Sequence, residues 1–426
     1  MKSIVCKILI FSLILASLLI LASCGNEDSG SAASVTLNVY NWGEYISDGS
    51  LGSYDSNAAF EEYYYEKYGV RVEVNYTTYA TNEDMYSKLS GGAGSYDVIV
   101  PSDYMIERMI NEDMLLSWDV TELENYENIS EEFRGIYFDP NETYSVPYTY
   151  GKVGIIYNQT MVDEEDLEDM SWGLMWNEKY RGKILQFNNP RDGMATAMFL
   201  LGLDINSTDT ADWDRALEAL SEQKSLVQAY VSDEIFNKMI SNSASIAPYY
   251  AGDYITMVES NPDLAFYYPK EGTNTFVDSM CIPKNAKNPE LAKEYINFML
   301  SPEPAVANAV YIGYASPNKL VRTNEDYIEE MGEEAIDVLY GTTESSYPYD
   351  TYYHTFTPEL QSYTYSLWET LKTTNSTETW VHVLSITIVA ALVSLAAYNT
   401  YIKKKRSRDY RARDKAKRQG FSREQK

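Results

Sequence analysis

Two apolar segments near the ends of the chain restrict how the residues between them can fold. Residues 8–20 follow Lys2 and Lys7 and lead into Leu21-Ala22-Ser23-Cys24, the pattern of a secretory signal that ends at a lipid-accepting cysteine. Residues 380–402 contain no Asp, Glu, Lys or Arg, and a run of this length can cross a bilayer. The basic run that follows predicts that this end faces the cytoplasm.

We therefore expect membrane attachment at both ends of a body that lies outside the cell. Residues 1–24 are predicted to be a lipoprotein signal with Cys24 as the acylated residue, and 25–34 a flexible spacer. At the other end, 374–379 read as a linker, 380–402 as a transmembrane helix and 403–426 as a basic cytoplasmic tail. The intervening residues 35–373 exceed the usual size of one hydrophobic core, which favours two lobes.

The charge of the chain argues against one class of partner. The formal net charge is −29 although the tail is basic, so the acidic residues concentrate in the body. Nucleic acid binding depends on neutralising phosphates with Lys and Arg, and we expect none here. An acidic body instead raises the local concentration of cations.

Strand and helix patterns alternate along the body. Predicted strands are 35–40, 70–76, 96–100, 183–187, 244–247, 264–268 and 277–282, and predicted helices are 57–68, 82–89, 191–201, 289–300 and 304–311. The alternation at the start favours a mostly parallel sheet with helices on both faces. Residues 144–157 are extended, broken by Pro147 and Gly151, and suit a crossover between lobes.

Few residues are suited to catalysis or metal binding. The chain has 2 His and 3 Cys, and it lacks metalloprotease, paired CxxC and phosphate-loop motifs. Cys281 lies in an apolar run and reads as a small buried hydrophobe. We therefore predict a protein that is not an enzyme and holds no cofactor or metal.

Aromatic residues beside acids follow two of the predicted strands. Trp42, Glu44 and Tyr45 come after the first strand, and Ser102 and Tyr104 after the third, where Ser102 can also cap the next helix. Open α/β sheets bind ligands at such strand ends. Aromatic faces attract ammonium groups and carboxylates pair with them, so this pattern indicates an organic cation.

Several short motifs together resemble the bacterial spermidine/putrescine-binding proteins of ABC importers, in the order and spacing of that family across residues 35–321. The motifs are Tyr40-Asn41-Trp42-Gly43-Glu44-Tyr45, Tyr96-Asp97-Val98-Ile99-Val100-Pro101-Ser102, Pro269-Lys270-Glu271-Gly272, Val277-Asp278-Ser279, Lys284-Asn285-Ala286-Lys287 and Ile312-Gly313-Tyr314-Ala315-Ser316-Pro317-Asn318.

The resemblance implies a fold and partners. The fold is an α/β, two-lobed periplasmic-binding-protein-like fold of type II with hinge crossover strands. Lobe one would comprise 35–147 and 277–323, and lobe two 148–276 and 324–373. The ligand would be a polyamine, delivered to a membrane permease that a cytoplasmic ATPase drives.

It also implies a role for each matching residue. The residues that would line the site are Trp42, Glu44, Tyr45, Ser102, Tyr104, Asn189, Asp192, Tyr250, Phe276, Asp278 and Tyr314. Asp192 and Asp278 would each hold an ammonium group, Phe276 would stack on the methylene chain, and Tyr314 would close the site. Tyr250 would replace another stacking ring. An acid in a strand-like run is costly to bury without a cationic or hydrogen-bonding partner, which makes Asp278 the strongest single candidate.

Two departures from the family pattern leave the ligand open. Asn189 takes a position that is often acidic in spermidine binders, so putrescine or another diamine fits as well. Phe276 offers less stacking area than a larger ring. A membrane-anchored sensor of polyamines also remains open, as does a binder of a quaternary amine, which calls for an aromatic cage.

Overall fold

The computed structural model describes residues 34–341, 348–349 and 351–373, with isolated positions at 387, 388, 390, 394 and 398. The predicted signal with Cys24, nearly all of the spacer, the linker, most of the span 380–402 and the tail lie outside the described residues. Among the helices that the structure describes, none is both long and apolar enough to cross a membrane.

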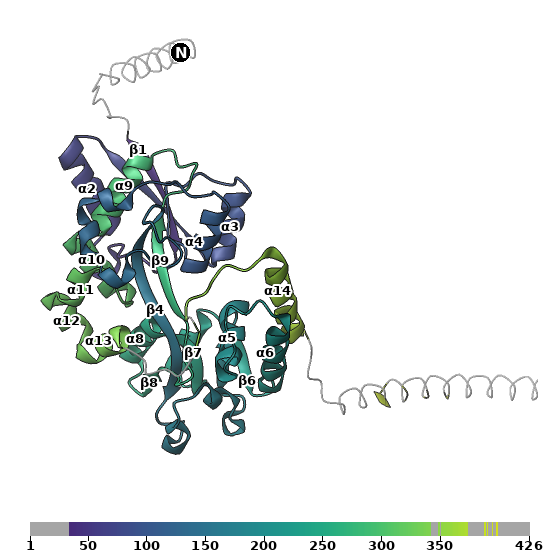
Figure 1. The fold of residues 1–426 in the computed structure, drawn as a ribbon. Coiled ribbons are helices and arrows are strands. Elements are labelled where there is room, and N and C mark those ends of the chain that lie inside the picture. Colours follow the sequence, from purple (N-terminus) through teal and green to yellow (C-terminus); the bar gives the residue numbers. More distant parts are fainter. Residues whose placement is uncertain are drawn as a thin grey trace, which may run out of the picture.

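One continuous mixed sheet joins two lobes, which Figure 1 shows one above the other. The strands follow the spatial order β2-β1-β3-β9-β4-β7-β5-β6, and β8 pairs with β4. Their bounds are β1 Val35–Trp42, β2 Val72–Tyr79, β3 Val98–Ile99, β4 Ser145–Asn158, β5 Ile184–Phe187, β6 Val227–Val231, β7 Ile246–Tyr250, β8 Leu264–Tyr267 and β9 Thr275–Cys281.

The sheet is parallel within each lobe and antiparallel where the lobes join. β1 is parallel to β2 and β3, and β5 is parallel to β6 and β7. β4 pairs antiparallel with β9 along its first half and with β7 and β8 along its second half. The expectation of a mostly parallel sheet is therefore wrong at the centre, because the two strands that cross between lobes run in opposite directions.

Helices cover both faces of the sheet. Those of the upper lobe in Figure 1 are α2 Ser56–Tyr68, α3 Asn82–Ser90, α4 Asp103–Asn111, α9 Pro289–Met299 and α10 Pro302–Ile312. The remaining helices are α5 Pro190–Leu200, α6 Thr210–Gln223, α7 Glu234–Ile240, α8 Ala251–Ser260, α11 Lys319–Arg322, α12 Glu325–Met331, α13 Glu333–Tyr340 and α14 Pro358–Thr373. The helix expected after Ser102 is α4, whereas the sequence did not predict α6, α7, α8 or α11–α14.

Local sequence explains where two of these helices begin and end. Asp55 precedes α2 and accepts a hydrogen bond from the amide of Ala58, and Gly69 ends the helix at a φ of 68°. Asn189 caps α5, and Pro190 takes its first position. This second cap places the first turn of α5 at the seam between the lobes.

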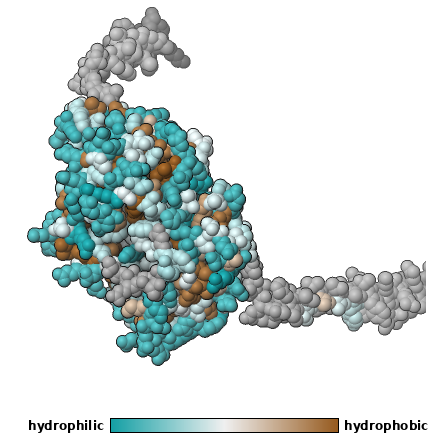
Figure 2. All heavy atoms as spheres, viewed as in Figure 1, coloured by the Kyte–Doolittle hydropathy of each residue, from teal (hydrophilic) through white to brown (hydrophobic). Residues whose placement is uncertain are grey.

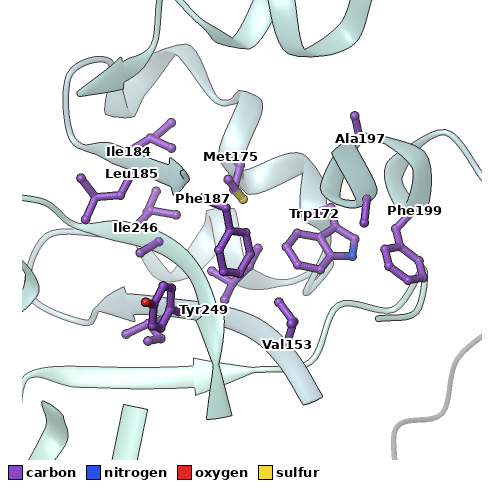
Figure 3. Packing of buried hydrophobic residues seen from close by; sticks show 14 of the residues in the cluster. Val153, Trp172, Met175, Ile184, Leu185, Phe187, Ala197, Phe199, Ile246 and Tyr249 are labelled. Carbon is purple, nitrogen blue, oxygen red and sulfur yellow. The ribbon is translucent and has the colours of Figure 1, made fainter. Parts of the chain in front are cut away.

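Each lobe has its own large hydrophobic core. One contains Leu37, Phe60, Ile99, Val277 and Ile296, and the other contains Ile155, Trp172, Phe187, Trp213 and Ile246. Figure 3 shows the second core, where Trp172, Phe187 and Tyr249 gather around the strands. Outside, hydrophilic residues cover most of the face drawn in Figure 2. The cores meet along β4 and β9.

Asp97 connects three parts of the first lobe. Its buried carboxylate accepts hydrogen bonds from the amides of Asn38, at 3.0 Å, Lys287, at 2.9 Å, and Asn288, at 2.8 Å. The first strand and the start of α9 are therefore held against the segment that leads into β3.

We expect Asp97→Ala to lower the free energy of unfolding of this lobe by about 3 kcal/mol, because three backbone amides lose a charged acceptor that is itself buried. Urea denaturation followed by fluorescence measures the change. Asp84→Ala, an exposed acid on α3 of the same lobe, is the control and should cost less than about 1 kcal/mol. Equal losses for the two variants would contradict this role for Asp97.

Candidate ligand-binding site

The candidate site lies at the seam between the two cores. In both lobes the carboxyl ends of parallel strands point towards this seam, the position at which open α/β sheets bind ligands. Trp42 ends β1 and Ser102 follows β3, whereas Asp192 follows β5 and Tyr250 ends β7. Asp278 comes from the crossover strand β9.

Asp278 is the buried acid of the first lobe, with 4% of its surface exposed. Its Oδ2 accepts a hydrogen bond of 2.6 Å from the hydroxyl of Tyr45, which also lies 2.6 Å from Thr149 Oγ1. Its Oδ1 has no hydrogen-bond partner among the described residues. Burial raises the pKa of Asp278 to about 6, and the nearby hydroxyls of Ser102 and Tyr45 limit the rise.

Asp192 is the buried acid of the second lobe, and three groups donate to it. The hydroxyl of Tyr353 lies 2.9 Å from Oδ1, and the hydroxyl of Tyr250 and the amide Nδ2 of Asn189 each lie 2.6 Å from Oδ2. Asn189 also accepts from the backbone amide of Asp192 at 2.8 Å. An ionised acid at position 189 could not donate to Asp192, so the amide orients a carboxylate here.

A row of rings connects the two acids. The ring centroids of Tyr250 and Phe276 are 5.5 Å apart, those of Phe276 and Tyr314 5.8 Å, and those of Tyr314 and Tyr45 5.7 Å. Tyr250 bonds to Asp192 at one end, and Tyr45 bonds to Asp278 at the other. The structure thus brings these six predicted site residues into one continuous group.

Two glycines leave the space that this row needs. A Cβ on Gly151 would lie 2.7 Å from Phe276, and a Cβ on Gly252 would lie 1.5 Å from Tyr314. Tyr314 follows α10, whereas Gly252 belongs to α8 of the second lobe. The Tyr314 ring therefore crosses the seam and packs directly on the backbone of the other lobe.

Asp253 is a third acid of the site, and sequence reasoning missed it. Its Oδ2 accepts a hydrogen bond of 2.9 Å from the hydroxyl of Tyr314. Burial raises the pKa of Asp253 to about 7, with a further rise from Asp233 and an opposing effect of Tyr314. The sequence did contain a pattern that predicts it, because aromatic residues stand beside an acid where β7 ends, as they do in residues 40–45.

The other predicted residues lie beside this group rather than in it. Trp42 donates through Nε1 to the carbonyl of Val100 at 2.9 Å, and the Tyr104 hydroxyl donates to Glu83 at 3.1 Å. Glu44 is exposed, with a φ of 54°, and accepts from the hydroxyl of Tyr311 at 3.3 Å.

Ser102 shows one further difference from expectation. It stands directly before α4, but its side chain makes no capping hydrogen bond. Its backbone instead forms an isolated bridge with Asp278, which places the serine beside that acid. Asp103, at the first helical position, is fully buried and accepts from the amides of Tyr104 at 2.7 Å and Val277 at 3.3 Å.

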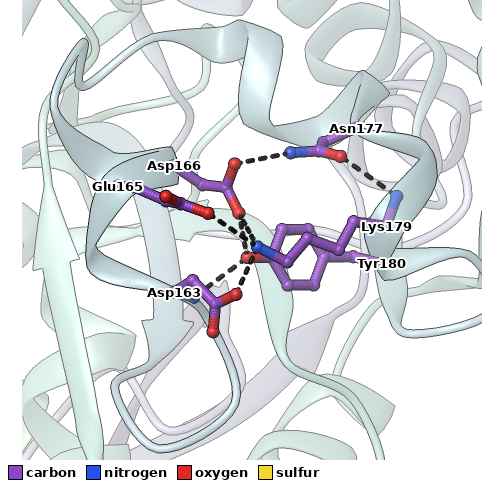
Figure 4. Close-up of polar contacts among 6 residues, drawn as sticks. All are labelled: Asp163, Glu165, Asp166, Asn177, Lys179 and Tyr180. Atoms are coloured by element: carbon purple, nitrogen blue, oxygen red, sulfur yellow. Dashed lines mark hydrogen bonds and ion pairs between the residues drawn. The ribbon is translucent and has the colours of Figure 1, made fainter.

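A second acidic cluster, on the connection between β4 and β5, already contains a cation. Figure 4 shows the ammonium of Lys179 between Asp163, Glu165 and Asp166, with distances of 3.7 Å to Glu165 and 2.7 Å to Asp166. No group of His, Cys, Asp and Glu among the described residues is arranged to hold a metal ion. The acids at the seam are thus the candidates for binding an external cation.

Comparison with known proteins agrees with this geometry. Residues 58–332 match the family described as bacterial extracellular solute-binding protein. A spermidine/putrescine-binding periplasmic protein of Salmonella typhimurium is 34% identical over 67% of this chain and 79% of its own length. A putrescine/cadaverine-binding protein of Pseudomonas aeruginosa is 26% identical over 71% of this chain and 84% of its own length.

A solved structure extends the match to the fold. The spermidine/putrescine ABC transporter substrate-binding protein PotD of Streptococcus pneumoniae is 33% identical, with a TM-score of 0.65 over 80% of this chain and 99% of its own. The family match, these identities and the two-lobed fold lead to one conclusion. The chain belongs to the bacterial extracellular solute-binding proteins.

Proposed function

We propose that this protein is the extracellular substrate-binding component of an ABC importer for polyamines such as spermidine or putrescine. The observation that carries the proposal is the placement of buried Asp192 and Asp278 at opposite ends of one row of aromatic rings. Its relatives that bind spermidine, putrescine or cadaverine support the same ligand class. The role is capture and delivery to a permease and its ATPase, without a catalytic step.

The chemistry of a polyamine matches the row of aromatic rings and the acid at each of its ends. One ammonium group pairs with Asp192 and another with the unpartnered Oδ1 of Asp278. Each charged hydrogen bond contributes about 1.5–3 kcal/mol. The methylene chain between them lies against Phe276, and the faces of Tyr45, Tyr250 and Tyr314 attract the ammonium ends.

Asp253 supplies the carboxylate that position 189 lacks. Asn189 and Tyr250 orient Asp192, and Ser102 and Tyr45 orient Asp278. With Asp253 the site has three acids, which suits a triamine as well as a diamine. Trp42 and Tyr104 support the wall of the first lobe, and Glu44 contributes negative charge at the exposed rim.

Binding and release require the lobes to separate. The hydrogen bond from Tyr314 to Asp253 crosses the seam, so a ligand can reach the row only when this contact opens. We assign the motion to a type II hinge at the crossover strands β4 and β9. The moving bodies would be 35–147 with 277–323 and 148–276 with 324–373.

Calorimetry on the full chain in detergent tests the function, and we expect heat with spermidine or putrescine and none with neutral amino acids. Asp278→Asn should weaken binding by about 1.5–3 kcal/mol, because the amide keeps the shape but loses the charge. Asp84→Asn, an exposed acid on α3 outside the candidate site, is the control and should change affinity by less than about twofold. Absence of heat with every polyamine would reject the function, and unchanged affinity in Asp278→Asn would remove that residue from the site.

Affinity should fall as the pH falls through 7 and then 6. The pKa of Asp253 is about 7 and that of Asp278 about 6, and only the ionised carboxylates attract ammonium groups, which stay protonated throughout this range. Binding near pH 6.5 should therefore release protons, measured as heats that depend on the ionisation enthalpy of the buffer. Asp253→Asn should abolish the part of the fall in affinity that occurs near pH 7. A flat profile from pH 8 to pH 5.5 would contradict the assignment.

We also propose that both ends of the chain anchor it, through acylated Cys24 and through a transmembrane helix at 380–402 with a cytoplasmic tail at 403–426. The composition of these segments supports the proposal. Exchange of 1–24 for a cleavable secretory signal that lacks the lipid-accepting cysteine and removal of 380–426 should each leave the protein in the membrane fraction of the producing cell. Only the combination should release it. If one change alone releases the protein, the segment that this variant retains is not an anchor.

A further inference from the structure

The last part of the second lobe gives the candidate site a further structural support. Residues 351–373, which include α14, pass along the seam and contact the turn 188–193 that carries Asp192 (Figure 1). We propose that this C-terminal segment is a positioning element, which holds the Asp192 carboxylate towards the ligand and the adjacent Arg191 away from it. The proposal rests on the proposed function for its ligand, but the contacts that carry it do not.

The segment contacts Asn188, Arg191, Asp192 and Gly193 of the turn. The ammonium of Lys372 donates to the side-chain oxygen of Asn188. Arg191 Nη2 donates to the carbonyl of His354 at 2.6 Å, and Tyr353 donates to Asp192. Since these contacts come from both ends of the segment, they fix the turn from two directions.

Trp368 on α14 packs directly on the turn. It is 3% exposed, and its ring covers Gly193 so closely that a Cβ there would lie 2.4 Å from Cη2 and 2.6 Å from Cζ3. Gly193 is the residue after Asp192 in the first turns of α5. A change at Trp368 therefore moves the backbone that carries the carboxylate.

The segment also keeps a positive charge away from the site. The guanidinium carbon of Arg191 lies 3.6 Å from the ring centroid of Phe356 and 4.5 Å from that of Tyr353. No carboxylate among the described residues lies within ion-pair distance of Arg191. The rings and the carbonyl thus hold the protein's own cation, so that it does not neutralise the adjacent Asp192.

Contacts with the first lobe complete the support. The amide of Thr355 donates to Glu107 at 2.5 Å, and Arg108 donates to Gln361 at 3.3 Å. Both partners belong to α4, the helix that begins beside Asp278. The segment therefore sets the position of the Asp192 turn relative to both lobes.

A set of matched variants in the full chain tests the positioning role, with putrescine as the probe. Trp368→Phe and Gly193→Ala should each weaken binding about tenfold. The double variant should bind more tightly than Gly193→Ala alone, because phenylalanine lacks the ring atoms that the new Cβ would overlap. Trp176→Phe is the control, a second-lobe tryptophan whose indole nitrogen donates to the carbonyl of Ala219, and it should leave affinity within about twofold.

Two readouts separate positioning from general destabilisation. In an Asp192→Asn background, Trp368→Phe should have less than about a twofold further effect, because both changes act through one carboxylate. Without ligand, amides 191–194 should exchange hydrogen faster in Trp368→Phe than in the wild type. A full further loss in the Asp192→Asn background, or unchanged exchange, would overturn the inference. If the wild type binds neither putrescine nor spermidine, the function fails while the exchange experiment still decides the positioning role.

Discussion

Carboxylates buried at the seam between two hydrophobic cores are the constraint on which this structure depends. A buried charge costs several kcal/mol unless hydrogen bonds or an opposite charge compensate it. Asp192 accepts from Tyr250, Tyr353 and Asn189, and Asp278 accepts from Tyr45. These neutral donors stabilise the ionised acids without cancelling their charge, so the seam can fold without a ligand and still favour a cation.

This requirement gives a reason for tyrosine at the seam, in a chain with 39 of them. A phenylalanine or leucine would fill the same space but would offer nothing to the acids, whereas tyrosine supplies both a ring face and a donor. Burial raises the pKa of Tyr45, Tyr250, Tyr314 and Tyr353 well above its usual value, and the neighbouring acids raise it further. The hydroxyls therefore remain protonated donors at physiological pH.

The sequence predicts the local elements better than the contacts between them. Asn189 and Pro190 mark the start of α5, and the motif around Asp278 identifies a buried acid. The packing of α14 on the turn that carries Asp192 cannot be predicted from the sequence in the same way. Its buried residues recur with a helical period, but Gly193 carries no sign that a tryptophan from the far end of the body needs its space. Such complementarity exists only once distant segments pack together.

Asn189 and Asp253 show a related limit of reasoning from sequence. Read position by position, Asn189 removes a carboxylate from the family pattern and favours a diamine. In the fold, the carboxyl ends of β5 and β7 lie at one edge of the sheet, and Asp253 enters the same site from the second of them. The proposed polyamine ligand would meet the total charge at that edge, whichever strand supplies it. Under the proposed function, the preferred amine length would therefore follow from the three acids together and not from position 189 alone.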